Sequence, residues 1–332
     1  MMFVVTSYLT AIILCFITML CWGSWANTQK MASKEWGFPL YYWDYSLGII
    51  LFSLILGLTL GSNGHSGVPF IRNLYQSQFD SIGFALLGGI IFNIANLLLV
   101  TAIDIAGMAI AFPIGIGIAL VQGVLINYLA VPDGNPILLF SGVALVTLAI
   151  IADAIAYKNI NIRKSSTKGI LLSICAGILM GFFYRFVATS MSKNFDVIDI
   201  GKLTPYTATF IFAIGVFISN FLFNTILMYK PLSGAPVSYS DYFKKGNTKL
   251  HLIGILGGAI WCMGMELNTI AAGKAGFAIS YGLGQGATMV AALWGVFIWK
   301  EFKNAPKATN ALIALMFFLF LSGLTLIILA KI

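Results

Sequence analysis

Two ionisable side chains lie deep inside long apolar stretches of the sequence. Glu266 occurs in "GGAIWCMGMELNTIAAG" (257–273) and Arg185 in "GFFYRFVAT". An ionisable group within a membrane costs at least about 2.5–3.5 kcal/mol on insertion scales, so it indicates a cavity or a pairing role. Counted along their segments, both lie about 25 Å from the same membrane face, at about 1.5 Å per residue. We therefore expect either an ion pair that locks two helices or a carboxylate that alternates between a proton and Arg185.

Asp44 is a further acidic residue within an apolar segment, in the aromatic stretch "YYWDYS". Its aromatic neighbours are typical of the belt that membrane proteins place at the lipid–water interface. A short acidic side chain near the start of a helix also suits a capping role. Two interpretations stay open: a cap at the membrane interface, or a part of the substrate site.

Amide side chains within the apolar segments form a second group of candidates. Amides offer both donors and acceptors to a polar, uncharged solute; the alternative is hydrogen bonding between packed helices. Asn93 and Asn96 are three residues apart and share a helix face, whereas Glu266 and Asn268 diverge by about 200° and cannot both point at one site. The amide candidates are Asn93, Asn96, Gln122, Asn268 and Gln285.

Large aromatic side chains complete the candidate site. Trp22, Trp261 and Tyr281 have rings that could stack on a planar solute, with packing against the core or lipid as the alternative. No HExxH pattern and no CxxC pair occurs, and the two histidines lie apart. We therefore expect a transporter rather than an enzyme, without a metal site or a cofactor. The expected driving force is a proton gradient, with sodium as the alternative ion.

The composition requires a membrane to position these residues. Hydrophobic residues make up 59% of the 332 and charged residues only 9%, against about 25% charged in soluble domains. The net charge of +8 does not indicate nucleic acid, because no basic domain exists to carry a binding patch. About 20 apolar residues suffice for a spanning helix, and we predict ten such helices in one all-α polytopic membrane domain that contacts the lipid bilayer. The predicted spans are 6–27, 41–62, 80–102, 105–130, 136–157, 168–192, 203–228, 250–272, 276–299 and 308–330.

An internal repeat divides the chain into two halves. The stretch "LGGIIFNIANLLLVTAIDIAGMAIAFPIG" (87–115) aligns without gaps onto "LGGAIWCMGMELNTIAAGKAGFAISYGLG" (256–284), and this alignment places Leu97 opposite Glu266. We predict two five-helix repeats, 1–160 and 161–332. Because five is odd, the second repeat enters the bilayer from the opposite side. Such inverted-topology repeats place the substrate site at the interface between the halves.

The distribution of basic residues predicts the orientation. Most of the 19 Lys and Arg residues fall on the side that holds the first interhelical connection, and the positive-inside rule makes that side cytoplasmic. We expect a multi-pass protein of the plasma membrane with both termini outside, as a monomer or a homodimer.

Five stretches of sequence, in order over nearly the whole chain, carry a resemblance to a known family. They are "YYWDYSLGIILFSLILGLTLG", "FALLGGIIFNIANLLLVTAI", "LMYKPLSGAPVSYSDYF", "AAGKAGFAIS" and "WGVFIWKEF". With the ten predicted helices and "CWGSW", they resemble the ureide permease family of the drug/metabolite transporter superfamily. The resemblance implies proton-coupled uptake of small heterocyclic nitrogen compounds, such as allantoin, uracil and other nucleobase-like solutes.

Two features of the resemblance limit what it implies. Family members of plant type carry a Walker-like sequence in a long central loop, but here that loop is only about 158–167, "KNINIRKSST". No nucleotide-binding site is therefore expected. Glucose and rhamnose transporters are related to the family, so a pentose or hexose symporter is the alternative function, and a drug/metabolite exporter is a further one.

Overall fold

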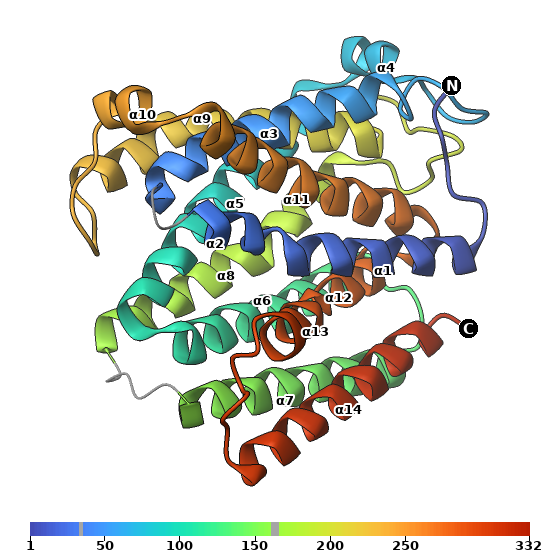
Figure 1. Cartoon of the computed structure of the whole chain (residues 1–332). Coiled ribbons are helices and arrows are strands. Elements are labelled where there is room, and N and C mark those ends of the chain that lie inside the picture. Colours follow the sequence, from blue (N-terminus) through green and yellow to red (C-terminus); the bar gives the residue numbers. More distant parts are fainter. Residues whose placement is uncertain (33–35, 161–165) are drawn as a thin grey trace.

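Among the described residues, ten helices are long and apolar enough to cross a membrane (Figure 1). The computed structural model describes residues 1–32, 36–160 and 166–332. A chain in lipid must satisfy its backbone hydrogen bonds internally, which is why these apolar segments are helical. The all-α polytopic fold predicted from the composition is therefore confirmed.

The observed spans differ from the predicted ones mainly at their ends. Two short helices, α4 (Phe70–Gln76) and α10 (Tyr239–Lys245), lie in the connections between spans. The basic residues Lys34, Arg163 and Lys164, which contributed to the predicted orientation, lie outside the described residues. The spans are α1 (Tyr8–Ser24) continued by α2 (Ala26–Ala32), α3 (Phe38–Leu58), α5 (Phe79–Ala106), α6 (Met108–Ala130), α7 (Pro136–Ile160), α8 (Thr167–Ser190), α9 (Pro205–Tyr229), α11 (Thr248–Ala275), the ninth span made of α12 (Phe277–Gly284), α13 (Ala287–Leu293) and the π-helix η1 (Trp294–Ile298), and α14 (Lys307–Leu329).

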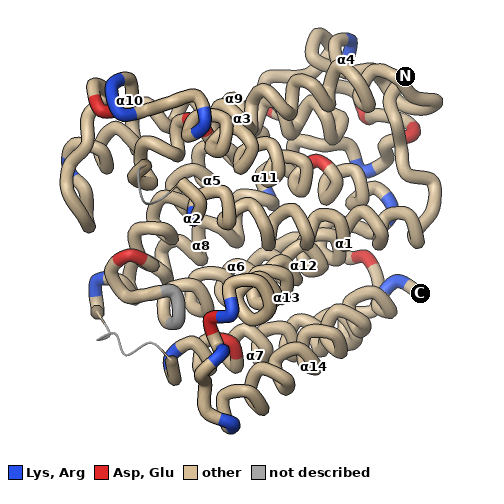
Figure 2. Tube along the Cα trace, viewed as in Figure 1, with Lys and Arg blue, Asp and Glu red and all other residues tan. Residues whose placement is uncertain are grey.

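The helix bundle has two polar ends. Both chain termini and α4 lie at one end, which we call the termini face, and α10 lies at the other, which we call the α10 face (Figure 1). Charged residues gather near the ends of the helices and in their connections, and the middles of the spans are almost free of them (Figure 2). An even number of crossings places both termini on one side of the membrane.

Two connections between neighbouring spans have the same backbone geometry. Gly107, between α5 and α6, has φ 84° and ψ 154°, and Gly276, between α11 and α12, has φ 85° and ψ 154°. Glycine adopts such positive φ values without the steric cost that other residues incur. The two glycines stand at equivalent positions of the sequence alignment. One turn at equivalent positions is what the predicted repeat requires, and the inverted 5+5 arrangement itself stays a prediction.

Three spans depart from a regular, uninterrupted α-helix. Trp25 separates α1 from α2, Gln285 and Gly286 separate α12 from α13, and Pro113 lies inside α6. Proline removes a backbone donor from the helix, and a break frees further backbone groups. Irregular backbone at membrane depth is tolerated where it is buried in protein or lines a cavity. We therefore expect a cavity or binding site near these three places.

Glycines allow α3 and α11 to approach until their backbones touch. A Cβ atom on Gly258 would lie 1.9 Å from the backbone oxygen of Tyr45, and one on Gly48 would lie 2.2 Å from that of Ile255. Lipid supplies no hydrophobic driving force between helices, so their association depends on van der Waals packing. Small residues strengthen that packing because they let two helix backbones approach closely. This contact fixes the relative position of the helices that carry Asp44 and Glu266.

Candidate substrate-binding site

A cavity of about 430 Å³ lies where the three irregular spans meet, and Trp25, Pro113 and Gln285 all line it. Its walls come from α1, α2, α5, α6, α7, α8, α11, α13 and η1. The lining is mainly apolar with a few polar side chains, as is typical of sites for small molecules. The mouth is at the α10 face, where Lys30 and Glu301 are partly exposed.

Aromatic rings close the inner end of the cavity. The rings of Trp22 and Trp261 are nearly parallel, at 16° with centroids 6.0 Å apart, and Trp22 Nε1 donates to the Trp261 carbonyl at 3.2 Å. Behind them, Trp261 packs on Phe92 at 4.3 Å and on Phe212 at 5.7 Å, while Phe183 contacts both phenylalanines. We call these five residues the aromatic floor. It offers a planar surface held in place by its own packing.

Two amides keep hydrogen-bonding capacity at the cavity wall. Asn96 donates to the hydroxyl of Tyr42 at 3.2 Å, and within the described chain its carbonyl oxygen accepts no hydrogen bond. The side-chain amide of Gln285, at the break between α12 and α13, has no hydrogen bond to any described residue. Since both residues line the cavity, their free donor and acceptor atoms are available to a solute.

Polar contacts hold the mouth of the cavity. Lys30 on α2 forms an ion pair with Glu301 at 2.8 Å, and the hydroxyl of Tyr157 on α7 donates to the other carboxylate oxygen at 2.8 Å. Asp153 lines the same wall. The sequence reasoning missed the role of Glu301, and its position in "WKEF" at the end of the ninth span was the available signal.

Of the eleven predicted site residues, the structure brings four together at the cavity: Trp22, Asn96, Trp261 and Gln285. Four others bond to the backbone or side chains of neighbouring helices, which was the alternative interpretation. These bonds are from Asn93 to Ser219 (2.8 Å), from Gln122 to the Ile178 carbonyl (3.0 Å), from Asn268 to the Ser280 carbonyl (2.7 Å), and from Tyr281 to the carbonyls of Ala119 (3.3 Å) and Met180 (3.2 Å).

Glu266 and Arg185 do not meet. Glu266 is fully buried, Arg185 is half-buried, and the ion pairs formed by the described residues do not include one between them. The reason lies in the helix packing, because α8 packs chiefly against α5 and α6 whereas α11 packs against α1 and α3. Equal depth along two helices therefore did not bring their side chains together, and neither residue lines the cavity.

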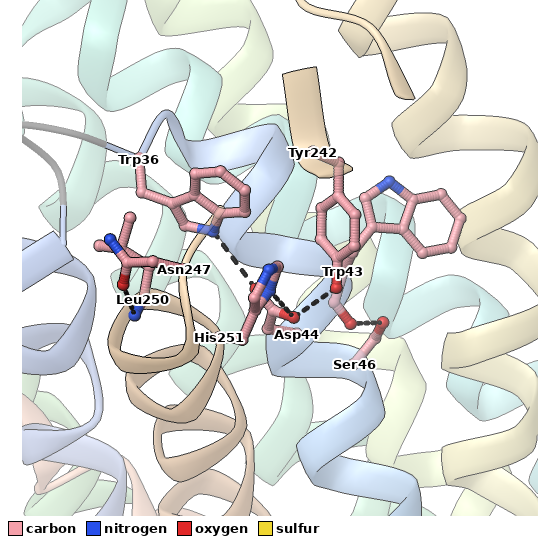
Figure 3. A network of polar contacts seen from close by, with 8 residues as sticks. All are labelled: Trp36, Trp43, Asp44, Ser46, Tyr242, Asn247, Leu250 and His251. Atoms are coloured by element: carbon pink, nitrogen blue, oxygen red, sulfur yellow. Dashed lines mark hydrogen bonds and ion pairs between the residues drawn. The ribbon is translucent and has the colours of Figure 1, made fainter. Parts of the chain in front are cut away.

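Asp44 lies in a separate polar network near the α10 face (Figure 3). Its carboxylate is 1% exposed, accepts from the Tyr242 hydroxyl at 2.5 Å and from Trp36 Nε1 at 3.3 Å, and lies 2.9 Å from His251 Nδ1. Gly37, not Asp44, stands at the N-cap of α3. The capping interpretation of Asp44 is therefore wrong, and the residue is also absent from the cavity lining. Its network ties α10 and α11 to α3.

The Asp44 network also changes the pKa of Tyr242, which lies on α10, outside the membrane spans. Burial of the ring raises the pKa of Tyr242, and the hydrogen bond to the Asp44 carboxylate and the charge of that carboxylate raise it further. The hydroxyl therefore keeps its proton to a higher pH than an ordinary tyrosine does, and it donates a hydrogen bond to the Asp44 carboxylate. Sequence reasoning missed this contact because Tyr242 and His251 lie about 200 residues from Asp44 along the chain.

Asp44→Asn should loosen α10, because a neutral amide accepts weaker hydrogen bonds than a carboxylate. A hydrogen bond to a charged group contributes about 1.5–3 kcal/mol, so we expect trypsin to cut after Lys244 or Lys245 about tenfold faster. Cleavage is followed by mass spectrometry of the purified protein. Tyr75→Phe, at an exposed side chain of α4 on the opposite face, is the control. Equal cleavage in both variants would contradict the proposed attachment.

Comparisons with known proteins agree on one family. A family model described as "Ureide permease" matches residues 41–168 and 156–330. Ureide permease 1 and Ureide permease 2 of Arabidopsis thaliana are each 23% identical to this chain. The alignment with Ureide permease 1 covers 96% of each protein, and the alignment with Ureide permease 2 covers 98% of each. Probable ureide permease A3 of Vigna unguiculata is 21% identical over 90% of this chain and 97% of its own length.

One solved structure shares the fold. It is a crystal structure of a protein that is 15% identical to this chain, and the superposition covers 96% of each with a TM-score of 0.58. At that identity the likeness supports the arrangement of the helices alone.

Proposed function

Because this chain belongs to the ureide permease family, we propose that it is a secondary active transporter that takes up small, polar, heterocyclic nitrogen compounds. The proposed solutes are ureides such as allantoin, together with uracil and other nucleobase-like compounds. The permease relatives and the membrane-spanning fold point to transport rather than to catalysis. The small-molecule substrate would pass between the two faces of the helix bundle.

The observation that carries this proposal is the combination of a flat ring with unoccupied amide groups at one end of the cavity. A planar heterocycle can stack on Trp22, since aromatic faces pack well in offset or parallel arrangements. Such solutes present N–H donors beside carbonyl acceptors around their rim. The free carbonyl of Asn96 suits an N–H group, and the amide of Gln285 suits both.

We further propose that a proton gradient drives uptake and that the α10 face is cytoplasmic, in the plasma membrane. The excess of basic residues on that face supports the orientation. With both termini outside, the described conformation opens its cavity to the cytoplasm and is closed toward the outside. A proton gradient directed inward would then favour accumulation of solute inside the cell.

The test is uptake into proteoliposomes that contain the purified protein. We expect radiolabelled uracil or allantoin to accumulate when the exterior is more acidic than the interior. The accumulation should disappear when a protonophore collapses the gradient, and liposomes without protein provide the background. Uptake of a pentose or hexose with no uptake of either heterocycle would contradict the proposal and favour a sugar symporter. Transport that only exports would favour an exporter.

A further inference from the structure

Glu266 is buried apart from the cavity. We call its surroundings, formed by Thr209, Tyr206 and Cys262, the Glu266 compartment. Its side chain is fully buried and neither carboxylate oxygen has a hydrogen-bond partner in the part of the chain that the structure describes. The polar side chain beside it is Thr209 on α9. The other titratable groups that face it are Tyr206 on α9 and Cys262 on its own helix. No described charged group of α1, α3, α9 or α12 compensates its charge.

The aromatic floor separates this compartment from the cavity. On α9, Thr209 stands three residues before Phe212, and on α11, Glu266 stands five residues after Trp261. These two helices are consecutive spans and run antiparallel, and Phe212 stacks on Trp261. At about 1.5 Å per residue, Glu266 is therefore about 7.5 Å beyond the floor, on the side of the termini face.

The N-terminal segment covers the compartment at the termini face. The hydroxyl of Tyr206 donates to the Phe3 carbonyl at 3.0 Å. Met2 is fully buried, and its backbone N–H donates to the Ser66 carbonyl at 2.8 Å. Glu266 is thus closed off on both sides in the described conformation. A movement of the N-terminal segment would open it to the termini face without opening the floor.

We propose that Glu266 is the proton-binding site of this transporter, separate from the solute site and loaded from the termini face. This inference rests on the transport function proposed above. An unpaired carboxylate charge buried in apolar surroundings is costly, whereas the neutral acid is tolerated. A hydronium ion at the termini face gives its proton to the carboxylate and becomes water. After the floor opens, the acid returns that proton to water in the cavity.

The small number of oxygen ligands around Glu266 favours a proton over another cation. A hard cation needs several oxygen ligands around it, and the side-chain hydroxyls that the described structure assigns beside Glu266 are those of Thr209 and Tyr206. The Tyr206 hydroxyl already donates to the Phe3 carbonyl. The hydroxyl of Thr269 is already donated to the backbone carbonyls of Met265 and Glu266. The sequence alignment places Leu97 opposite Glu266, so the fold itself does not require an acid at this position.

The experiment compares Glu266→Gln with the wild type in proteoliposomes, with uracil as the probe. Glutamine resembles the protonated acid but cannot exchange the proton. A gradient of one pH unit can concentrate solute about tenfold per coupled proton. We expect the variant to bind uracil and to exchange it across the membrane as the wild type does. It should lose the tenfold accumulation and the accompanying proton influx. Asp80→Asn, at an exposed carboxylate of α5, should behave as the wild type.

The outcomes separate the inference from the function on which it rests. If the wild type neither binds nor transports uracil, allantoin or another heterocycle, the proposed function fails. If the wild type accumulates uracil and Glu266→Gln still does so under a proton gradient, the assignment of Glu266 is wrong. Loss of uracil binding in the variant would contradict separate sites, and accumulation that needs sodium would contradict proton binding. Glu266→Asp, which retains an acid, should keep proton-driven accumulation and serves as a second variant.

Discussion

Replacing Gln285 by leucine should weaken solute binding by about tenfold or more while the protein stays folded. The amide of Gln285 lies at the break in the ninth span, lines the cavity, and has no hydrogen bond to any described residue. A bound solute would supply the missing partners. Leucine fills similar space but leaves the polar groups of the solute unpaired, and each such group costs about 1–3 kcal/mol.

The matched control for this prediction is Gln122→Leu. Gln122 has the same side chain in another span, but its amide donates to the Ile178 carbonyl of α8 and does not line the cavity. We expect its substitution to lower the thermal stability of the protein without changing the Kd for solute. The Kd is measured by isothermal titration or by the concentration dependence of ligand-induced stabilisation. Equal loss of affinity in both variants would contradict a specific contact with Gln285.

The fold could be predicted from the sequence because the length and hydropathy of each apolar segment directly indicate a membrane-spanning helix. Lipid permits few other structures, so a long apolar segment predicts a helix without knowledge of its neighbours. The breaks were harder to predict. The glycines around Gln285 indicated close packing or flexibility, but whether such a segment unwinds depends on the helices that surround it.

The site residues could be predicted from the sequence only in part, because the sequence of an apolar span does not reveal which of its faces lines the cavity. Asn93 and Asn96 share a helix face, yet Asn93 bonds to Ser219 on α9 and only Asn96 lines the cavity. In a helix on the surface of a soluble protein, the apolar face shows which side chains point to the core and the polar face shows which point to solvent. Here apolar residues surround every face, and the neighbouring helices alone decide which amide is satisfied by the protein.

Long-range partners were the least predictable part. The contact between Asp44 and His251 joins the third helix of the chain to the start of α11, and no spacing rule connects them. The same limit explains why Glu266 and Arg185, at equal depth, do not meet. Depth along a span can be counted from the sequence, but the identity of the adjacent helix depends on the packing of the whole bundle.

Gly258→Ala should destabilise the protein although it adds only one methyl group. The new Cβ would lie 1.9 Å from the Tyr45 carbonyl oxygen and 2.9 Å from the Ile49 nitrogen. Both atoms belong to the backbone of α3, so no side chain can rotate to make room and the two helices must separate. Overpacking of this kind costs about 1–3 kcal/mol, which should appear as a lower midpoint of thermal unfolding in detergent.

Gly117→Ala provides the matched control because it makes the same chemical change within a spanning helix. A Cβ atom at Gly117 of α6 would have no neighbour within 4 Å. Alanine is a better helix former than glycine by about 0.5–1 kcal/mol, so this variant should be as stable as the wild type or slightly more stable. Opposite signs from identical substitutions would show that backbone contact with α3, rather than helix propensity, determines the effect at Gly258. If both variants unfold at the same temperature, α3 and α11 do not touch as described.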